Sequence, residues 1–422
     1  MGALTPLLWI DGQARDRIDA SVRPDALYGH FAVQHSDGKR HFLARDPMGV
    51  HKLFFALRDD GTVDTDPWLH ELLARAPAQR VFAVPSSAVL AIDADAGTIS
   101  RMPYPELPFD TASSEDDAAR GVTEALTLAF ERIARRIDDD RHVYVTLSGG
   151  LDSSTIATFA AEHLPRERLT AVTLHVDDGR PVAEGSDLHA ARSVAKHLKV
   201  PLCELVVEPS SILELVDDAL LFGQDFRDFN VHCALVNAAI ARELAAQIAL
   251  PCDHLLTGDG ANELMSDYEA VDLEGRSYYE LPKLTRSALR RFLVRGLDAG
   301  DREVGVFARY GLRCIQPFLL AARAFAAVPG QLIDDRTAKS RIARRVLGDR
   351  IPGAIFDRPK VRAQCGREGE PSGTMAVLIR AGIDQDALNR RFMELYGVDA
   401  RFMRGLIRAG MYRAPQRFEE LI

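Results

Sequence analysis

Long apolar runs are absent from this chain of 422 residues. None reaches the roughly 18 residues needed to span a bilayer. The apolar stretch Leu4–Ile10 is shorter than the core of a secretion signal. Pro6 also stands where a myristoylation signal has Ser or Thr. We therefore expect a cytoplasmic protein that has no membrane partner.

Cysteine is scarce, and its few copies are scattered. The count is odd, and no pair has the CxxC spacing of a zinc site or redox motif. This pattern indicates a reducing compartment and argues against a disulfide framework. The five positions are Cys203, Cys233, Cys252, Cys314 and Cys365.

A long basic run is also missing, and the formal net charge is −9. A large nucleic-acid footprint needs clustered positive charge, so we expect no nucleic-acid partner. Hydrophobic residues make up 47% and charged residues 27%, as in ordinary globular proteins. The length allows two or three domains, each with its own core.

The most informative stretch joins an apolar run, Val143–Leu147, to a helical pattern through Ser148-Gly149-Gly150. Such a run predicts a strand, and glycines between strand and helix let the backbone approach a ligand. The free N–H groups of the first helical turn attract an anion. The loop has no lysine of the Walker type, so it differs from those NTPases. The alternative is a plain tight turn between strand and helix.

Three side chains extend this prediction of an anion site. Ser153 and Ser154 can cap the helix and offer hydroxyls to phosphate oxygens. Asp152 places a carboxylate beside the anion, and a magnesium ion between the two would balance their charges. The loop is therefore expected to bind the phosphates of a nucleotide with Mg²⁺.

The rest of the chain divides into a β-rich beginning and an alternating remainder. Short strands are predicted at 31–33, 41–44, 53–57 and 87–92. A stretch rich in proline and acids follows, and then a helix from Asp117 to Ile137. Beyond it we predict strands at 142–147, 169–176, 202–207 and 254–256, and helices at 153–163, 186–198, 212–222 and 231–247.

This alternation indicates a parallel sheet covered on both faces, and beyond Leu281 the pattern is mostly helical. In such sheets ligands bind where strands end and helices begin. Three of these edges are Ser148-Gly149-Gly150, the end of strand 169–176 and Gly258-Asp259-Gly260. The cluster Arg336–Arg345 has two readings, a substrate or phosphate site and a solvated helix face.

Four segments, in this order, carry a resemblance to a known family. They are Phe42–Val50 (FLARDPMGV), Ser148–Ser154 (SGGLDSS), Thr257–Glu263 (TGDGANE) and Arg358-Pro359-Lys360. The chain resembles glutamine-dependent asparagine synthetase and its relatives, the β-lactam and carbapenam synthetases and the lasso-peptide cyclases. Ser148–Ser154 resembles the pyrophosphate loop of the wider ATP pyrophosphatase superfamily, which splits ATP between its α and β phosphates.

The resemblance implies an α/β fold with two domains. Residues 1–105 would form a β-rich, degenerate domain like the Ntn-hydrolase glutaminases, and 106–117 a linker. Residues 118–422 would form a doubly wound parallel-sheet synthetase domain with a helical C-terminal part.

The resemblance also implies the site. Lys360 and Asp259 are the candidate catalytic residues, and Asp152 and Asp259 the candidate ligands of Mg²⁺. Lys360 would stabilise negative charge on the α-phosphate and the tetrahedral oxyanion, and Asp259 would take the amine proton. The residues expected to bind ATP are Leu147, Ser148, Gly149, Gly150, Leu151, Asp152, Ser153, Ser154, Val172, Thr173, Leu174 and Gly258.

Departures from the family pattern shape the expected function. Gly2 stands where glutaminase domains have the nucleophilic cysteine, and the first cysteine is Cys203. Without that thiolate no ammonia is released from glutamine. Asn262 replaces a family aspartate and is a weaker magnesium ligand. Asp259 agrees with the acid of the asparagine synthetases, where the β-lactam synthetases have tyrosine.

We therefore expect an amide-bond synthetase that forms AMP and pyrophosphate, adenylating a carboxylate and using a free amine, with a role in natural-product biosynthesis. An intramolecular lactam or macrolactam cyclase is the alternative. Two further hypotheses are a tRNA-modifying enzyme, opposed by the acidic charge, and a degenerate scaffold, opposed by the intact loop and Lys360. The substrates would be small-molecule or peptide carboxylates and amines. A homodimer or a partner biosynthetic protein stays open.

Overall fold

The computed structural model describes residues 4–38, 40–58, 60–138, 140–177, 179, 181–182, 184–247, 253–273, 276–278, 281–297, 301–367, 370–371 and 373–403. Gly2 and Cys252 lie outside the described residues. The other four cysteines have free thiols.

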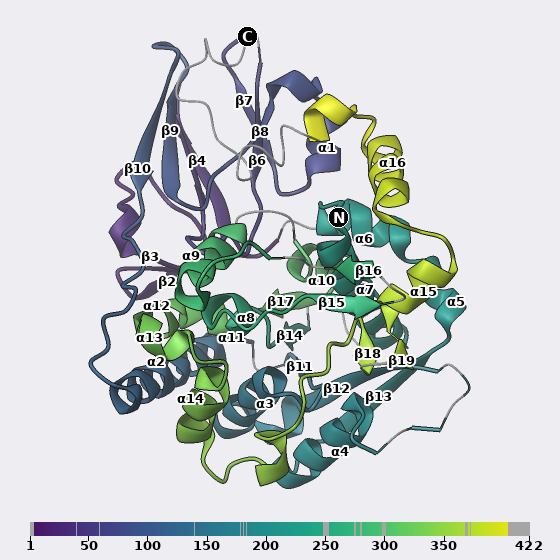
Figure 1. Cartoon of the computed structure of the whole chain (residues 1–422). Coiled ribbons are helices and arrows are strands. Elements are labelled where there is room, and N and C mark those ends of the chain that lie inside the picture. The colour runs from purple at the N-terminus through teal and green to yellow at the C-terminus, as the bar shows by residue number, and fades with distance from the viewer. Residues whose placement is uncertain are drawn as a thin grey trace.

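The N-terminal region is rich in antiparallel strands, as expected, and lies at the top of Figure 1. Its three sheets have the orders β2-β1-β3, β10-β9-β5-β4 and β7-β6-β8. Sequence patterns located β4, β5, β6 and β9 and missed the other strands, most of which have four residues or fewer. The elements are β1 (Leu7–Ile10), β2 (Gln13–Arg15), β3 (Leu27–His30), β4 (Ala32–Asp37), β5 (Arg40–Arg45), β6 (Phe54–Leu57), β7 (Val63–Asp66), α1 (Leu69–Leu73), β8 (Val81–Ala83), β9 (Ala88–Asp93) and β10 (Thr98–Pro103).

A parallel sheet of five strands forms the centre of the remaining chain and confirms the α/β prediction. The strand order is β13-β12-β11-β14-β17, so the chain starts in the middle and winds outward in both directions. Val143 of β11 pairs with Leu169 of β12 on one side and with His254 of β14 on the other. The strands are β11 (Val143–Thr146), β12 (Leu169–Val176), β13 (Leu202–Val207), β14 (His254–Leu256) and β17 (Arg313–Ile315).

Helices cover both faces of this sheet because crossover connections between parallel strands are right-handed. Two successive crossovers in one direction put α3 (Leu151–His163) and α4 (Asp187–Leu198) on the same face (Figure 1). The return crossover to β14 puts α7 (Asp228–Gln247) on the other face. The reversal between β11 and β14 is a topological switch point, where a ligand crevice is expected.

One detail of the sequence prediction was wrong. The single helix expected at 212–222 is two helices, α5 (Pro209–Leu213) and α6 (Val216–Gly223), because Pro209 starts a separate short turn of helix. The stretch beyond Leu281 is mostly helical, as expected, and it also supplies the short edge strand β17, which was not predicted.

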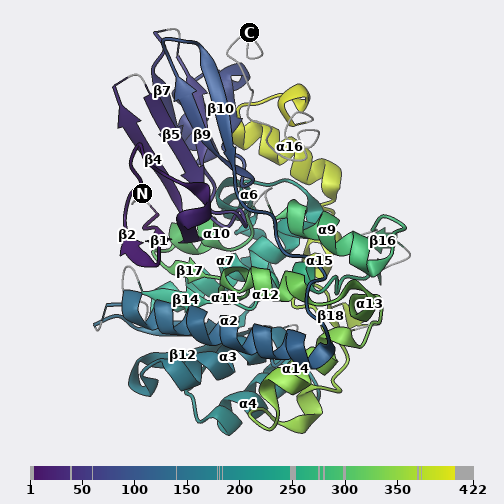
Figure 2. The same ribbon diagram turned by 90° about the vertical axis from the view of Figure 1, so that its left-hand side faces the viewer.

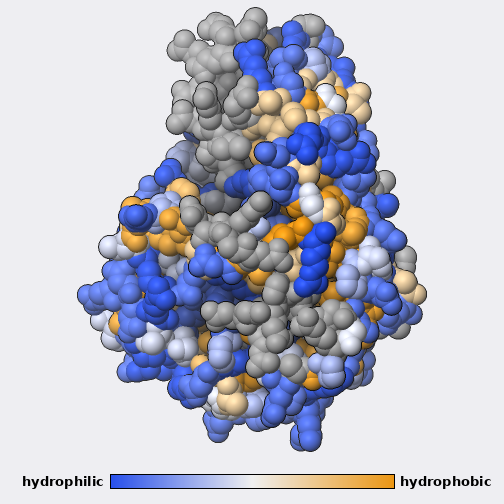
Figure 3. All heavy atoms as spheres, turned by 45° about the vertical axis from the view of Figure 1, so that its right-hand side comes forward, coloured by the Kyte–Doolittle hydropathy of each residue, from blue (hydrophilic) through white to orange (hydrophobic). Residues whose placement is uncertain are grey.

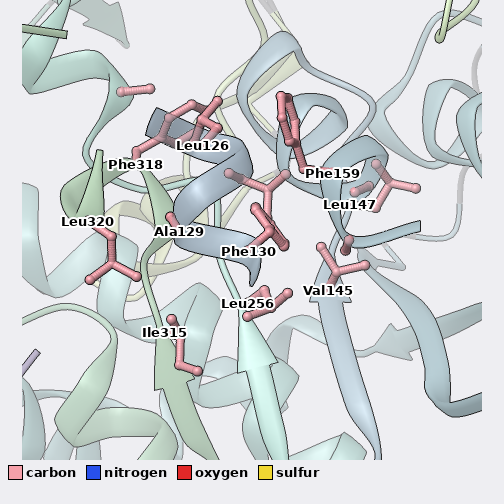
Figure 4. Packing of buried hydrophobic residues seen from close by; sticks show 14 of the residues in the cluster. Leu126, Ala129, Phe130, Val145, Leu147, Phe159, Leu256, Ile315, Phe318 and Leu320 are labelled. Atoms are coloured by element: carbon pink, nitrogen blue, oxygen red, sulfur yellow. The ribbon is translucent and has the colours of Figure 1, made fainter. Parts of the chain in front are cut away.

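The main core lies between the sheet and α2 (Glu115–Arg136), which crosses the width of the molecule in Figure 2. Leu126, Ala129 and Phe130 of this helix pack over the sheet together with Phe159 of α3 (Figure 4). Trp9 from the N-terminal region belongs to the same cluster of buried residues. The N-terminal strands therefore share a core with the sheet, and the boundaries at 105 and 117 stay a prediction.

The remaining elements follow β14 and fill the space around the sheet. They are α8 (Ala261–Leu264), β15 (Val271–Leu273), β16 (Arg276–Tyr278), α9 (Arg286–Gly296), α10 (Val304–Arg309), α11 (Pro317–Leu320), α12 (Ala322–Ala327), α13 (Gly330–Ile333), α14 (Ala338–Leu347), β18 (Gly366–Arg367), β19 (Glu370–Pro371), α15 (Thr374–Arg380) and α16 (Gln385–Tyr396). Hydrophilic residues cover most of the face seen in Figure 3. Among the described residues no helix combines the length and the apolar character required to cross a membrane.

Candidate active site

A cavity of about 480 Å³ opens at the carboxyl ends of β11, β12 and β14, at the predicted switch point. Its walls include the loop after β11, the middle of β12, one face of α7, the loop after β14, the start of α14, and residues 355–364. The last two parts lie more than 180 positions after the first loop in sequence, so the fold alone brings them to it.

The first loop is held in shape by glycine and by serine hydroxyls. Gly149 has φ +71°, and a Cβ there would lie 2.4 Å from the Cβ of Ala190 on α4, so only glycine fits. The Ser153 hydroxyl accepts the Ser148 N–H at 3.1 Å and donates to the Gly150 carbonyl at 3.2 Å. The loop is thus closed on itself at the N-terminus of α3.

The predicted serine cap was wrong. Helix α3 begins at Leu151 with Gly150 as N-cap, and no side chain caps it. Ser153 and Ser154 therefore lie inside the first turn, where their N–H groups are already oriented along the helix axis. This leaves the N-terminal end of the helix directed at the cavity without a competing side-chain acceptor.

The second loop lies directly against the first. A Cβ on Gly258 would meet the Ser153 N at 2.9 Å, so the backbones of the two loops are in close approach. Any larger residue at this position would push the loops apart. The neighbouring strands β11 and β14 explain this contact, since both loops leave the same edge of the sheet.

Ten of the twelve residues expected to bind ATP line the cavity. Gly149 does not line it, and Ser154 is fully buried beside it. The Val172 carbonyl accepts the Leu147 N–H at 2.8 Å, so that group is engaged within the sheet. The lining residues of this set are Leu147, Ser148, Gly150, Leu151, Asp152, Ser153, Val172, Thr173, Leu174 and Gly258. Their roles in nucleotide binding stay a prediction.

Two lysines converge on one acidic group in the cavity. The Lys360 ammonium donates to Asp267 Oδ2 at 2.7 Å and to Asn262 Oδ1 at 2.9 Å. The Lys339 ammonium donates to Asp267 Oδ2 at 2.9 Å, to Asn262 Oδ1 at 2.7 Å and to Asp152 Oδ2 at 2.6 Å. Asn262 therefore accepts from both lysines with its amide oxygen.

Sequence reasoning missed Lys339 and Asp267. Lys339 is the lysine of the Arg336–Arg345 cluster, and its presence among arginines was the signal that could have marked it. In the structure the arginines and the lysine of this cluster have different surroundings, and a role in binding substrate or phosphate stays a prediction. Arg341 pairs with Glu115 at 3.1 Å and Arg345 with Asp116 at 2.6 Å, which fastens α14 to α2. Lys339 lies in the cavity.

The charges of this group depend on one another. Burial favours the neutral form of Lys339, but Asp152 and Asp267 outweigh it and raise the pKa of this lysine. Burial and the nearby Lys339 ammonium lower the pKa of Lys360 to about 8. Against the effect of burial, the two lysines hold the pKa of Asp267 far below its usual range. At neutral pH the cavity thus presents two ammonium groups.

Arg358 has a different task from Lys360. Its guanidinium donates to Asp187 at 2.7 Å and to the carbonyl of Gly185 at 3.1 Å, and its side chain is only 10% exposed. It also reaches the Ser148 carbonyl at 3.5 Å. These contacts tie the segment that carries Lys360 to the first loop, so Arg358 is a positioning residue.

Asp259 forms a carboxyl pair with Glu303 at the back of the cavity. Burial raises the pKa of Asp259 and raises that of Glu303 well above its usual range, and each of the two carboxyl groups affects the pKa of the other. Arg302 contacts Glu303 at 3.1 Å and Glu263 at 2.9 Å. Burial thus favours the protonated form of both carboxyl groups, and the nearby Arg302 guanidinium partly offsets this for each of them.

The residues that line the cavity fit a magnesium ion only together with the phosphates of a nucleotide. In the part of the chain that the structure describes, no group of three or more His, Cys, Asp and Glu residues could hold a metal by itself. Asp152 and Asp259 are engaged separately, by Lys339 and by Glu303. Mg²⁺ commonly binds through one or two carboxylates together with substrate phosphates, and Asp152 lines the cavity with a carboxylate suited to that. The metal roles stay a prediction.

Comparison with known proteins gives a consistent picture. The family model for asparagine synthase matches residues 124–305. A carboxyethyl-arginine beta-lactam-synthase from Streptomyces clavuligerus is 27% identical over 384 residues, which cover 86% of this chain and 69% of that protein. A putative glutamine-hydrolyzing asparagine synthetase from Mycobacterium tuberculosis is 25% identical over 330 residues, covering 70% of this chain and 48% of that protein.

Two further matches complete the comparison. The human glutamine-hydrolyzing asparagine synthetase is 22% identical over 367 residues, covering 78% of this chain and 62% of that protein. An NH3-dependent NAD synthetase structure from Campylobacter jejuni matches 42% of this chain and 73% of its own, at 18% identity. Its TM-score of 0.25 is too low to support an argument. The chain spans between about half and two thirds of the length of most of these relatives.

Proposed function

Because this chain belongs to the asparagine synthetase-like family, we propose that it joins a carboxylate to an amine at the expense of ATP. The reaction would form an acyl-adenylate and pyrophosphate, and then an amide and AMP. The observation that carries this proposal is the convergence of two lysine ammonium groups on Asp152 and Asp267 beside the glycine loop. A cavity of this kind suits a polyphosphate.

The first step is adenylation. A carboxylate oxygen of the substrate attacks the α-phosphorus of ATP, the bond from that phosphorus to the bridging oxygen breaks, and pyrophosphate leaves with the electron pair. Negative charge grows on the α-phosphate and on the leaving group. Lys360 and Lys339 would offset this charge, together with the N–H groups at the start of α3.

The second step is aminolysis. The amine nitrogen attacks the acyl carbon, the bond from that carbon to the AMP oxygen breaks, and AMP departs. A neutral amine that attacks must lose one proton from its nitrogen as the amide forms, and the Asp259 carboxylate would accept that proton. Lys360 would stabilise the oxyanion of the tetrahedral intermediate.

Magnesium would assist the first step. Asp152 would hold the ion together with phosphate oxygens of ATP, and the ion would supply positive charge to the departing pyrophosphate. A carboxylate oxygen of Asp152 already receives the Lys339 ammonium, so the ion and the lysine would share this residue.

We further propose that residues 1–105 act as a scaffold and not as a glutaminase, with 106–117 as a linker to the synthetase domain at 118–422. Contacts across the two parts support a fixed arrangement. Lys52 donates to the Leu297 carbonyl at 3.0 Å, and the Leu69 N–H donates to Gln224 at 2.7 Å. The nitrogen would then come from an amine substrate and not from glutamine.

Intramolecular ring closure is the second candidate. It is favoured by the Streptomyces relative, whose name describes a β-lactam synthase and whose match covers 86% of this chain. In that case one molecule would bring both the carboxylate and the amine to the cavity.

Product analysis tests the proposal. The protein is incubated with ATP, Mg²⁺ and a panel of carboxylates, amines and amino acids, and the nucleotide products are separated. AMP and pyrophosphate in equal amounts are expected, whereas ADP would refute the adenylation step. A product with the mass of one amino acid less one water would identify ring closure, and an amide that joins two molecules would identify the intermolecular reaction.

A further inference from the structure

A second cavity, of about 450 Å³, lies behind the first. Four residues line both cavities: Phe229, Asp259, Tyr268 and Arg302. The rest of its wall comes from the N-terminal region around Met48, from the start of α7, from α8 and α9, from the segment before α10, and from Leu281, Gln316, Leu319 and Gln385. Asp259 therefore stands between the cavity proposed for ATP and a separate space.

The second cavity has an excess of acidic groups. Five carboxyl side chains and three basic ones line it. The basic groups are all engaged. Lys52 donates to the Leu297 carbonyl, Arg227 pairs with Asp225, and Arg302 pairs with Glu263 and Glu303. The five acidic residues are Asp228, Asp259, Glu263, Asp301 and Glu303.

One of these acids carries an unsatisfied oxygen. Glu263 is 5% exposed and lines the second cavity but not the first. Its Oε1 accepts the Tyr268 hydroxyl at 2.7 Å and Arg302 at 2.9 Å. Its Oε2 is buried and has no hydrogen-bond partner among the described residues. A buried acceptor of this kind is costly unless a donor arrives to satisfy it.

The opposite wall of the second cavity is apolar. Leu281, Phe292, Leu293 and Leu297 line it. Phe292 is 55% exposed, which is unusual for a large aromatic side chain and places an apolar edge next to solvent. The cavity thus combines an acidic end, shared with the first cavity through Asp259, and an apolar side.

We infer that the second cavity binds the amine substrate, as a protonated primary amine that carries an apolar body. This inference rests on the proposed function and names one of its two substrates. The ammonium group lies near the carboxyl groups of Glu263 and Asp259, and the apolar body lies against the leucines and Phe292. The first cavity, lined by more basic than acidic residues, takes the nucleotide. The amine and the nucleotide then meet at the carboxylate that lines both cavities.

Binding without ATP tests the inference separately from catalysis. Phenethylamine is titrated into the protein by calorimetry, with 2-phenylethanol and 3-phenylpropanoate as probes of the same shape but neutral or negative charge. The amine is expected to bind at least about tenfold more tightly than either, because a hydrogen bond to a buried charged group is worth roughly that or more. Equal or tighter binding of the carboxylate would overturn the inference.

Two variants locate the site. Glu263→Gln should weaken phenethylamine binding about ten- to a hundredfold, since the amide loses the charge that attracts the ammonium. Phe292→Ala should weaken the binding of phenethylamine but leave the binding of methylamine unchanged. Because the Phe292 side chain is exposed, the variant is expected to fold normally. Leu128→Ala, an exposed change on α2 outside both cavities, is the control. Unchanged binding in both cavity variants would refute the site.

Failure of this inference can be told apart from failure of the proposed function. Amine binding with no AMP formed from any acid and amine pair would leave the cavity assignment standing and refute the ligase. AMP formation without selective amine binding would support the ligase and refute the cavity assignment. The same holds if amine binding is unchanged by Glu263→Gln and Phe292→Ala.

Discussion

Replacing Lys339 by methionine removes the ammonium that binds the carboxylates of Asp152 and Asp267 in the proposed nucleotide cavity. Lys339 makes three hydrogen bonds, of 2.6 to 2.9 Å, and its side chain is 11% exposed. Methionine keeps the length of the side chain and removes the charge. Breaking a buried ion pair costs roughly 3–5 kcal/mol. We expect about 3 kcal/mol of lost stability, because Asp267 keeps Lys360 as a partner.

The same substitution should change the pH dependence of adenylation. The Lys339 ammonium is one cause of the lowered pKa of Lys360, which is about 8. Without it Lys360 holds its proton to a higher pH. Because protonated Lys360 would offset phosphate charge, the adenylation rate should fall as pH rises through the pKa of Lys360. In Lys339→Met this fall should occur at a higher pH. The rate at neutral pH should drop about 10²–10³-fold, as for loss of one preorganised contact.

The assay is the exchange of labelled pyrophosphate into ATP, measured across neutral and alkaline pH with an acid identified by product analysis. This half-reaction needs no amine, so titration of the amine cannot imitate the effect. Lys196→Met, on the exposed surface of α4, is the matched control. A normal exchange rate together with an unshifted alkaline fall in Lys339→Met would refute the role given to this lysine.

Three further predictions concern the same chemistry. Lys360→Ala should fold normally and lose about 10²–10³ of kcat, as measured by AMP release, and an unchanged kcat would return this residue to the role of a surface lysine. Asp152→Asn should abolish turnover at any practical Mg²⁺ concentration, and normal activity in a magnesium titration would disprove the metal and phosphate assignment of the first loop. Glutamine should yield no glutamate, with or without ATP, because the first cysteine of the chain is Cys203; steady glutamate release would reveal an unrecognised nucleophile.

Local patterns were sufficient for much of the fold. The alternation of apolar strands and amphipathic helices after His142 predicted four strands of the parallel sheet, because each has enough consecutive apolar residues to show a period. Strand β17 was not predicted; β14 is equally short, but it runs into the glycine-rich segment Thr257–Glu263, which marks its end. Most of the missed N-terminal strands are also short, and they are stabilised by pairing with neighbouring strands.

Some parts of the candidate site could be recognised from local sequence, whereas others depend on packing between distant segments. The string Ser148–Ser154 and the pair Gly258-Asp259 could be found because each is a local turn with its own residue requirements, such as the positive φ of Gly149. The carboxyl pair of Asp259 and Glu303 could not be found, because its two members lie 44 positions apart and only the packing of α10 brings them into contact. No local signal marks such a pair.

The sequence by itself determined that this chain has a glycine loop between a strand and a helix, an alternating α/β remainder and a family resemblance that includes Lys360. The tertiary structure decided which charges meet at that loop. Lys339 reaches Asp152 across 187 positions because ion pairs from Arg341 and Arg345 fasten α14 to α2. Short-range signals specify turns and helices, whereas the partner of a charged side chain depends on how the finished helices pack.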